Sequence, residues 1–459
     1  MTEIQTFQRR PRSLIGPFIL IGIGVVFLLQ NLGVLSRHSI FLWFSRFWPL
    51  VLVIWGVVRL IEYALARKNN QPSPRIGPGS ILFLIFFVLI GLAATRAASW
   101  NWEGMRARIN VDPQDDVTDP FGVFGNRYEF TENYAEEIKP ESQVKVIAAR
   151  GNLTVTKSPD SQIHVFLHKY LRSDSQSTAD RINGSTHPHF SQQGNTWVLD
   201  MTSGSYQEGR FNLDLQLPTG TGLSLSTNHG DISVSDREGM VEMEADHGDL
   251  SATGIKGNAN LRLHGGSATV KNVSGNVNVD GRAEDIDVAD IGGTLTMTGD
   301  TKGDIHLARL SRPLHFSSTR TDLQFAKLGG ELSMESGELH ANSITGPFQL
   351  KTRQKEVHVD DLSGDVSIVD EEGDIDLQAK APLGNIDITN KAAEIKVTLP
   401  EKAAFEVEAQ SDGGEIQSDF SLNINNGDSR ATAKGTIGKG GPKIRLKTER
   451  GTIQLSKEQ

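Results

Sequence analysis

The chain has 459 residues, a formal net charge of −10 and no cysteine. This length exceeds one ordinary domain, and the lack of cysteine excludes disulfides, thiol catalysis and thiolate metal sites. Residues 1–98 hold ten Lys and Arg against two acids, a balance of +8, so the remaining residues carry −18. Such an acidic part lacks the basic face that nucleic-acid binding requires, so no nucleic-acid partner is expected.

Three apolar runs near the start of the chain predict helices at about residues 14–35, 47–65 and 80–96. A helix needs about 20 apolar residues to cross a bilayer. Three such runs so close together indicate a membrane domain over residues 1–98 rather than buried core helices or a signal peptide. We therefore expect this domain to be embedded in the membrane lipid bilayer, which would be its partner.

Basic residues near these runs predict the orientation of the membrane domain. Six lie before the first run or between the second and third, and three lie on the other side: Arg9, Arg10, Arg12, Arg67, Lys68 and Arg75 against Arg37, Arg46 and Arg96. Because positive residues remain in the cytoplasm, we expect a multi-pass protein of the cytoplasmic membrane with its C-terminal part extracytoplasmic. The segments "FLLQNLG" at 27–33 and "FWPLVLVIWGVVRL" at 47–60 resemble the LiaI/LiaF-like transmembrane region of bacterial envelope-stress proteins.

Residues 99–140, with several prolines among acids, are expected to form a linker, and residues 141–222 a β-strand cap. Alternating apolar residues predict strands in "QVKVIAARGNLTVTK" and "QIHVFLHKYL", and the polar stretch 173–195 predicts a loop. The cap is expected to cover the end of the structure that follows, since an open strand edge promotes aggregation.

A repeat begins at His-Gly-Asp 229–231, which returns at 247–249 after 18 residues. Apolar residues open successive blocks at the same spacing, and seven of the nine steps are 18 or 19 residues. These residues are Leu223, Val241, Ala259, Val277, Leu295, Leu314, Leu332, Phe348, Val366 and Ile386. Period-two alternation predicts short strands, and each block holds too few apolar residues to form a core alone.

The repeat therefore predicts an all-β fold over residues 223–397, a parallel β-solenoid with coils of about 18 residues, closed by a second strand cap over 398–459. A β-sandwich is the alternative, because it also uses short strands and Gly-rich turns. The segments "FNLDLQLPTGTGLSLSTNHGDISV" at 211–234 and "IRLKTERGTIQLSK" at 444–457 resemble the candidate adhesin family of bacterial envelope proteins. That resemblance implies a toast-rack-like β-solenoid and carries no catalytic motif.

Acidic residues recur at one position of most blocks and would form a ladder along one edge of a solenoid. Its members are Asp231, Asp249, Asp285, Asp304, Asp322 and Asp374. Asp residues that accept turn N–H groups explain the pattern, and a ladder of bridging cations such as Ca²⁺ is the alternative. His229 and His247 are expected to stack one coil apart, and "HPH" at 187–189 adds two imidazoles, but zinc needs three or four converging ligands.

No Gly-x-Ser-x-Gly elbow, His-Glu-x-x-His motif or phosphate loop occurs, so no catalytic or cofactor site and no enzyme activity is expected. The sequence favours a non-enzymatic, membrane-anchored envelope protein that presents its solenoid for adhesion, binding or envelope-stress sensing. Its partner would be an envelope polymer or another envelope protein. The alternative is a membrane-tethered scaffold that polymerises end to end, as bactofilins do.

Overall fold

The computed structural model describes residues 49–50, 52–53, 56–57, 88, 126–139 and 141–458. The chain divides into two compact units, residues 1–128 with 170–181 and residues 129–169 with 182–459. The predicted membrane helices lie outside the described residues, apart from a few helical positions between 49 and 88. The predicted linker, residues 99–140, is described only from residue 126, where Asn126–Glu137 form strand β1. Within the described residues, no helix is both long and apolar enough to cross a membrane.

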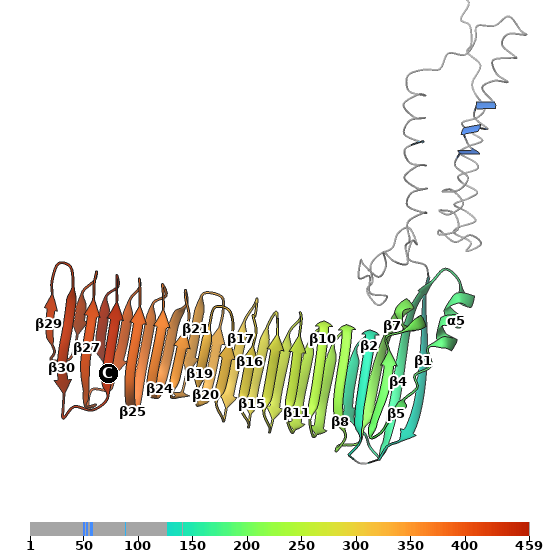
Figure 1. Ribbon diagram of the computed structural model, residues 1–459, viewed down its shortest axis with the longest axis horizontal. Helices are drawn as coiled ribbons and strands as arrows, with labels where there is room; N and C mark the ends of the chain where they lie inside the picture. The colour runs from blue at the N-terminus through green and yellow to red at the C-terminus, as the bar shows by residue number, and fades with distance from the viewer. Residues whose placement is uncertain are drawn as a thin grey trace, which may run out of the picture. The chain divides into compact units, whose positions relative to one another are not determined.

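The second unit contains a rod of stacked strands, which Figure 1 shows side by side along its length. Each coil contributes one strand to each of two faces, here called sheet 1 and sheet 2. Sheet 1 begins with β2 (Gln143–Arg150), β8 (Gly222–His229), β10 (Val241–His247), β12 (Ala259–Leu263), β14 (Val277–Gly281), β16 (Leu295–Thr298) and β18 (Leu314–Ser317). Sheet 2 begins with β3 (Leu153–Lys157), β9 (Ile232–Glu238), β11 (Leu250–Lys256), β13 (Ala268–Val273), β15 (Ile286–Ile291) and β17 (Ile305–Leu310).

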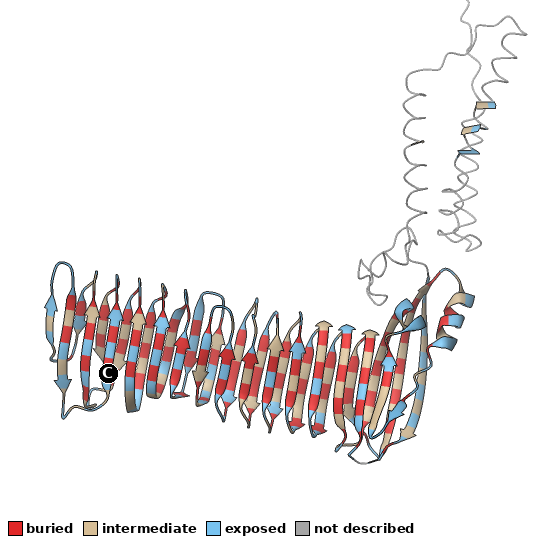
Figure 2. Cartoon of the chain, in the orientation of Figure 1, coloured by how far each residue is buried: buried red, intermediate tan, exposed pale blue. Residues whose placement is uncertain are grey.

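The strands of these coils pair in parallel at a constant register. Val241 lies opposite Leu223 on one side and Ala259 on the other, and the same column continues to Val277 and Leu295. Side chains in this column are buried, as the red bands on successive strands of Figure 2 show. An 18-residue step therefore returns the chain to the same place one coil further on. The predicted parallel β-solenoid is confirmed.

The chain reverses direction twice, midway along the rod. Strand β19 (Asp322–Phe325) pairs antiparallel with β18, and β20 (Lys327–Met334) pairs antiparallel with β17. A second turn then leads to β21 (Glu338–Asn342), antiparallel to β20, and on to β22 (Ile344–Thr345) and β23 (Phe348–Lys351). Parallel pairing resumes with β24 (Glu356–Asp370) and β25 (Ile375–Asn390). One antiparallel level is thus inserted into a parallel stack.

This reversal corrects the expected columns. Leu314, Leu332 and Phe348 do not open successive parallel coils, because Leu332 lies on sheet 2 opposite Leu307. The polar segments after β18 and β20 close tight hairpins, in which Ser318 N donates to Thr321 O at 2.9 Å and Glu335 N donates to Glu338 O at 2.9 Å. Since alternation has period two in either direction, a reversed strand still buries the same type of side chain.

The N-terminal end of the rod adds five further strands, two of which have 12 residues each. They are β1 (Asn126–Glu137), β4 (Gln162–Ser173), β5 (Ser191–Gln193), β6 (Thr196–Met201) and β7 (Gly209–Leu217), with a 3-10 turn at Gly204–Glu208. The stretch predicted as a loop contains helix α5 (Gln176–Ser185). Ser175 precedes this helix and its hydroxyl accepts the Thr178 N–H at 3.3 Å, which is an N-cap that the composition of the stretch concealed.

The C-terminal end closes by a crossing of strands. Its elements are β26 (Ile395–Leu399), β27 (Phe405–Ser411), β28 (Ile416–Ser418), β29 (Asn423–Asn426), β30 (Ala431–Ile437), β31 (Lys443–Thr448) and β32 (Ile453–Lys457). Strand β31 inserts between β25 and β27, and β32 inserts between β26 and β28. Antiparallel strands β30 and β29 follow β27, so the rod ends on a hairpin and not on an open coil.

Candidate functional site

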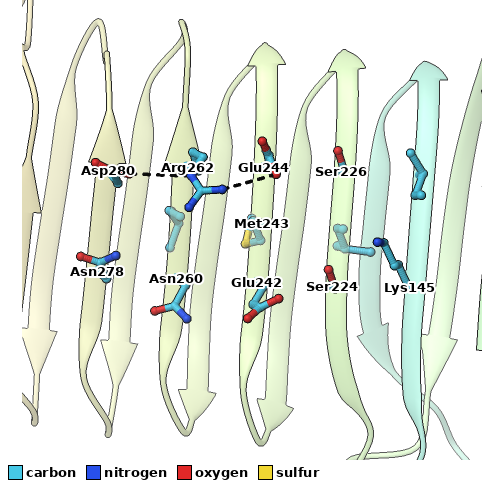
Figure 3. A pocket seen from close by; sticks show the side chains of 13 residues that line it. Lys145, Ser224, Ser226, Glu242, Met243, Glu244, Asn260, Arg262, Asn278 and Asp280 are labelled. Atoms are coloured by element: carbon cyan, nitrogen blue, oxygen red, sulfur yellow. Dashed lines mark ion pairs between the residues drawn. The ribbon is translucent and has the colours of Figure 1, made fainter. Parts of the chain in front are cut away.

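The outer side of sheet 1 carries a groove near the N-terminal end of the rod. Buried residues such as Val241 and Met243 alternate with outward polar residues, so each strand presents two polar side chains at the same height as its neighbours. Figure 3 shows the two resulting rows. One row is Ser224, Glu242, Asn260 and Asn278, and the other is Ser226, Glu244, Arg262 and Asp280.

The groove has a volume of about 360 Å³ and is open to solvent. Ser224 and Ser226 are short, so a hollow forms between Lys145 on one side and the Glu242 and Glu244 side chains on the other. Arg262 bridges the second row, with Nη1 3.9 Å from Glu244 Oε2 and Nε 3.7 Å from Asp280 Oδ2. Donors and acceptors therefore alternate along the groove at the strand spacing of about 4.8 Å.

The predicted acidic ladder lies along the corner between the sheets, where four of its six carboxylates accept backbone N–H groups; no such bond is formed by Asp304 within the described residues. Asp231 Oδ1 accepts the N–H of Asp249 at 3.0 Å, and Asp249 Oδ1 accepts that of Ser267 at 2.8 Å. Asp285 does the same for Asp304 at 2.9 Å, and Asp374 does so for Glu394 at 2.8 Å. Each of these four carboxylates thus caps an N–H of the following coil.

Asp322 is the member of this ladder whose placement needs correction. The reversal places it on sheet 1, opposite Ser317 and Lys351, and away from the corner. In the part of the chain that the structure describes, no three His, Asp or Glu side chains group as a metal site would require. A cation ladder on the remaining residues stays a prediction.

Histidines stack along the same rod. The rings of His229 and His247 lie 4.9 Å apart and 4° from parallel, as their spacing predicts. Burial lowers the pKa of His229, and the neighbouring His247 and Arg150 lower it further. A second stack, His340 on His358 at 4.8 Å, was not predicted, although the same 18-residue spacing separates the two.

A buried lysine near the N-terminal end also went unpredicted. Lys169 is fully buried, and its Nζ donates to Glu132 Oε1 at 2.6 Å, to Asn183 Oδ1 at 3.0 Å and to the Asn183 carbonyl at 3.1 Å. Burial lowers the pKa of this ammonium, whereas Glu132 acts in the opposite direction. The other Glu132 oxygen accepts from His187 Nδ1 at 3.0 Å, so the first imidazole of "HPH" joins an ion-pair cluster. No local sequence signal indicated these long-range partners.

Two protein-family models match segments of the chain. Residues 269–456 match the family model described as Toastrack DUF4097, and residues 15–105 match the one described as LiaF transmembrane domain. No curated protein matches the sequence.

Several solved structures are similar to the rod at low sequence identity. A candidate cell adhesion protein from Clostridium sporogenes is 8% identical, with 72% of this chain and 100% of that chain covered and a TM-score of 0.15. A candidate adhesin from Bacteroides fragilis is 12% identical, with 72% and 97% covered and a TM-score of 0.18. A candidate lipid binding protein from Parabacteroides distasonis is 9% identical, with 71% and 96% covered and a TM-score of 0.21. Both resemblances inferred from the sequence are confirmed, because the two matched segments fall in the rod and in the predicted membrane domain respectively.

Proposed function

We propose that this protein is a non-enzymatic, membrane-anchored protein of the cell envelope whose rod presents a binding surface outside the cytoplasmic membrane. The LiaF transmembrane match supports the anchor, and the toastrack match supports the envelope role. The excess of basic residues on one side of the predicted spans supports the orientation.

The observation that carries the binding role is the groove on sheet 1. Its two rows repeat hydroxyl, amide, carboxylate and guanidinium groups from strand to strand (Figure 3). An extended polymer with regularly spaced hydroxyl and amide groups could form hydrogen bonds with successive strands, so the proposed partner is an envelope polysaccharide. A protein partner would be expected to use a more apolar interface core than this groove offers.

The non-enzymatic part of the proposal has a chemical basis in the same groove. A serine nucleophile needs an adjacent base. Among the described residues, neither Ser224 nor Ser226 forms a hydrogen bond with a histidine. Glu244 and Asp280 instead lie 3.9 Å and 3.7 Å from the Arg262 guanidinium.

Binding can be tested by co-sedimentation of the full chain, in lipid nanodiscs, with insoluble cell-wall polysaccharide. The variant Glu244→Ala/Asn260→Ala/Arg262→Ala removes an acid, an amide and a cation from the groove. The control Thr269→Ala/Lys271→Ala/Asp287→Ala removes a hydroxyl, a cation and an acid, including the 2.6 Å Lys271–Asp287 pair, from neighbouring coils of sheet 2. We expect the groove variant to lose at least tenfold in bound fraction and the control to lose less than twofold. Equal binding by both variants would refute the groove.

The scaffold alternative requires coil ends that can stack. The C-terminal end finishes on the antiparallel strands β29 and β30, a geometry that differs from the parallel coils and does not favour continuation by a second copy. Analytical ultracentrifugation of the full chain in detergent distinguishes the two functions, because a filament former grows with concentration whereas the proposed receptor does not.

The side of the membrane can be measured directly. The chain has no cysteine, so Asp428→Cys in the exposed turn between β29 and β30 gives a single thiol. We expect a membrane-impermeant thiol reagent to label it in cells whose cytoplasmic membrane is intact. Labelling only after lysis would place the rod in the cytoplasm.

A further inference from the structure

The reversal leaves an opening in one corner of the rod. Strand β16 crosses to β17 through residues 299–304, and β23 crosses to β24 through 352–355, but β18 and β20 turn back instead of crossing. Two successive positions along the rod therefore have no connection from sheet 1 to sheet 2 at this corner. The connections on either side of this gap are three strand spacings apart, about 14 Å. The resulting cavity has a volume of about 780 Å³ and is lined by residues 300–303, 318–321, 334–336 and 352–355.

The floor of this cavity is apolar and its size suits a small molecule. Ile305, Phe316 and Met334 line it and are each at most 4% exposed. Small-molecule sites typically occupy about 300–1,000 Å³. Around this floor stand the hydroxyl side chains of Thr301, Thr319 and Ser336.

Four cations surround the cavity: Lys302, Arg320, Arg353 and Lys355. Lys355 is buried, and its Nζ donates to the carbonyl oxygens of Glu335 and Ser336 in the second hairpin. Burial lowers the pKa of Lys355 and the positive charge of Arg320 lowers it further, whereas the carboxylates of Asp370 and Glu335 act in the opposite direction. Within the described residues, none of the four forms an ion pair with a carboxylate.

Of the three acids that line the cavity, Asp300 and Glu371 have other partners, whereas the Glu335 carboxylate forms no hydrogen bond or ion pair within the described residues. Asp300 Oδ1 accepts from Thr319 N at 3.0 Å and from Thr319 Oγ1 at 2.8 Å, while Glu371 Oε1 lies 3.1 Å from Lys391 Nζ. Both carboxylates are therefore less available to the cations. Four cations without an ion pair against one unpartnered acid, Glu335, still favour an anionic ligand.

We propose that this cavity binds an anionic saccharide unit, a sugar that carries a phosphate or carboxylate group. Arginine forks match the oxygens of either group, so Arg320 and Arg353 would hold the anion. The threonine and serine hydroxyls would bind the sugar hydroxyls, and the apolar floor would contact one face of the ring. This site is separate from the sheet 1 groove and does not depend on it.

Isothermal titration calorimetry on the full chain in nanodiscs tests this assignment. The probes are glucose 6-phosphate, glucuronate, glucose and inorganic phosphate. The variant Arg320→Ala/Arg353→Ala removes two exposed cations, and Arg312→Ala, at the opposite corner of the rod, is the matched control. We expect one anionic sugar per chain, no measurable binding of glucose, at least a tenfold weaker affinity in the double variant and less than a twofold change in the control.

Three results would overturn the proposal. The first is no binding of either anionic sugar at millimolar concentration. The second is equal affinity in the wild type and the double variant, with circular dichroism showing that both are folded. The third is binding of inorganic phosphate as tight as that of glucose 6-phosphate, which would remove the saccharide from the assignment. Retained cell-wall binding in the double variant would show that the groove is independent.

Discussion

The regular coils from β8 to β17 and the reversed region from β18 to β21 bury the same kind of side chain, but their strands are connected differently. In the regular coils each corner is tied to the next, as when Asp249 accepts the Ser267 N–H. In the reversed region each hairpin closes on itself, through Ser318 to Thr321 and through Glu335 to Glu338. The apolar pattern therefore determines which side chains of a strand are buried. The turns determine the direction of the strand and the position of the cavity at the corner of the rod.

The largest expected contrast is in the tolerance of corner glycines. Gly248 has φ of +141°, and a Cβ there would lie 2.1 Å from the Gly230 carbonyl oxygen of the preceding coil. Gly337, in the hairpin before β21, has no atom within 4 Å of such a Cβ. We expect Gly248→Ala to lower the free energy of unfolding by about 3 kcal/mol or more, since strain and overpacking add. Gly337→Ala should change it by less than about 0.5 kcal/mol.

Urea unfolding of the full chain in detergent, followed by circular dichroism, measures both values. Similar stability of the two variants would mean that coils and hairpins are equally constrained, which the account excludes.

A smaller difference is expected between acids of the corner and of the hairpin. Asp249 accepts one N–H from the next coil, so Asp249→Ala should cost about 1 kcal/mol and Asp249→Asn, which keeps an acceptor, less than half of that. Glu335 has no side-chain hydrogen bond within the described residues, so Glu335→Ala should be nearly neutral. Thermal unfolding with and without Ca²⁺ makes the comparison. A Ca²⁺-dependent rise in Tm that Asp249→Asn abolishes would instead support the cation ladder.

The smallest expected effect concerns the pH dependence of the His229–His247 stack. Burial and the neighbouring His247 and Arg150 lower the pKa of His229 in the folded state. The unfolded chain therefore binds the proton more readily, so this contribution to stability is fully present above about pH 6.5 and is lost as the pH falls through the lower, folded-state value. We expect the Tm of the wild type to fall more between pH 7 and pH 5 than that of His229→Asn. An equal fall in Tm for the wild type and His229→Asn would show that protonation of His229 does not destabilise the folded chain.

Much of the rod could be predicted from the sequence because its spacing encodes its geometry. Columns such as Leu223, Val241 and Ala259 and the stack of His229 on His247 follow from one 18-residue period. The reversal could not be predicted in the same way. Leu323 and Leu332 keep the apolar alternation, although their strands β19 and β20 run antiparallel to the preceding strands β18 and β17. The distinguishing signal was the pair of short polar turns at 318–321 and 335–337, which also form the cavity.

The sites were harder to predict than the fold. The groove depends on outward residues such as Ser224 and Arg262, which carry no motif and gain meaning only from their neighbours on adjacent strands. Buried Lys169 and Lys355 depend on partners that are distant in sequence or on hairpin carbonyls. Spacing alone identifies neither kind of contact.

Disulfide formation between engineered cysteines tests the reversed region most directly. Gln324 lies opposite Gln349 across β19 and β23, whereas uninterrupted coils would place Ser333 opposite Gln349. In the structure Ser333 lies on sheet 2, opposite His306 and His340. Directly opposed strand residues are close enough for a disulfide. We expect Gln324→Cys/Gln349→Cys to cross-link under mild oxidation and Ser333→Cys/Gln349→Cys not to do so. Cross-linking of the second pair alone would contradict the reversal.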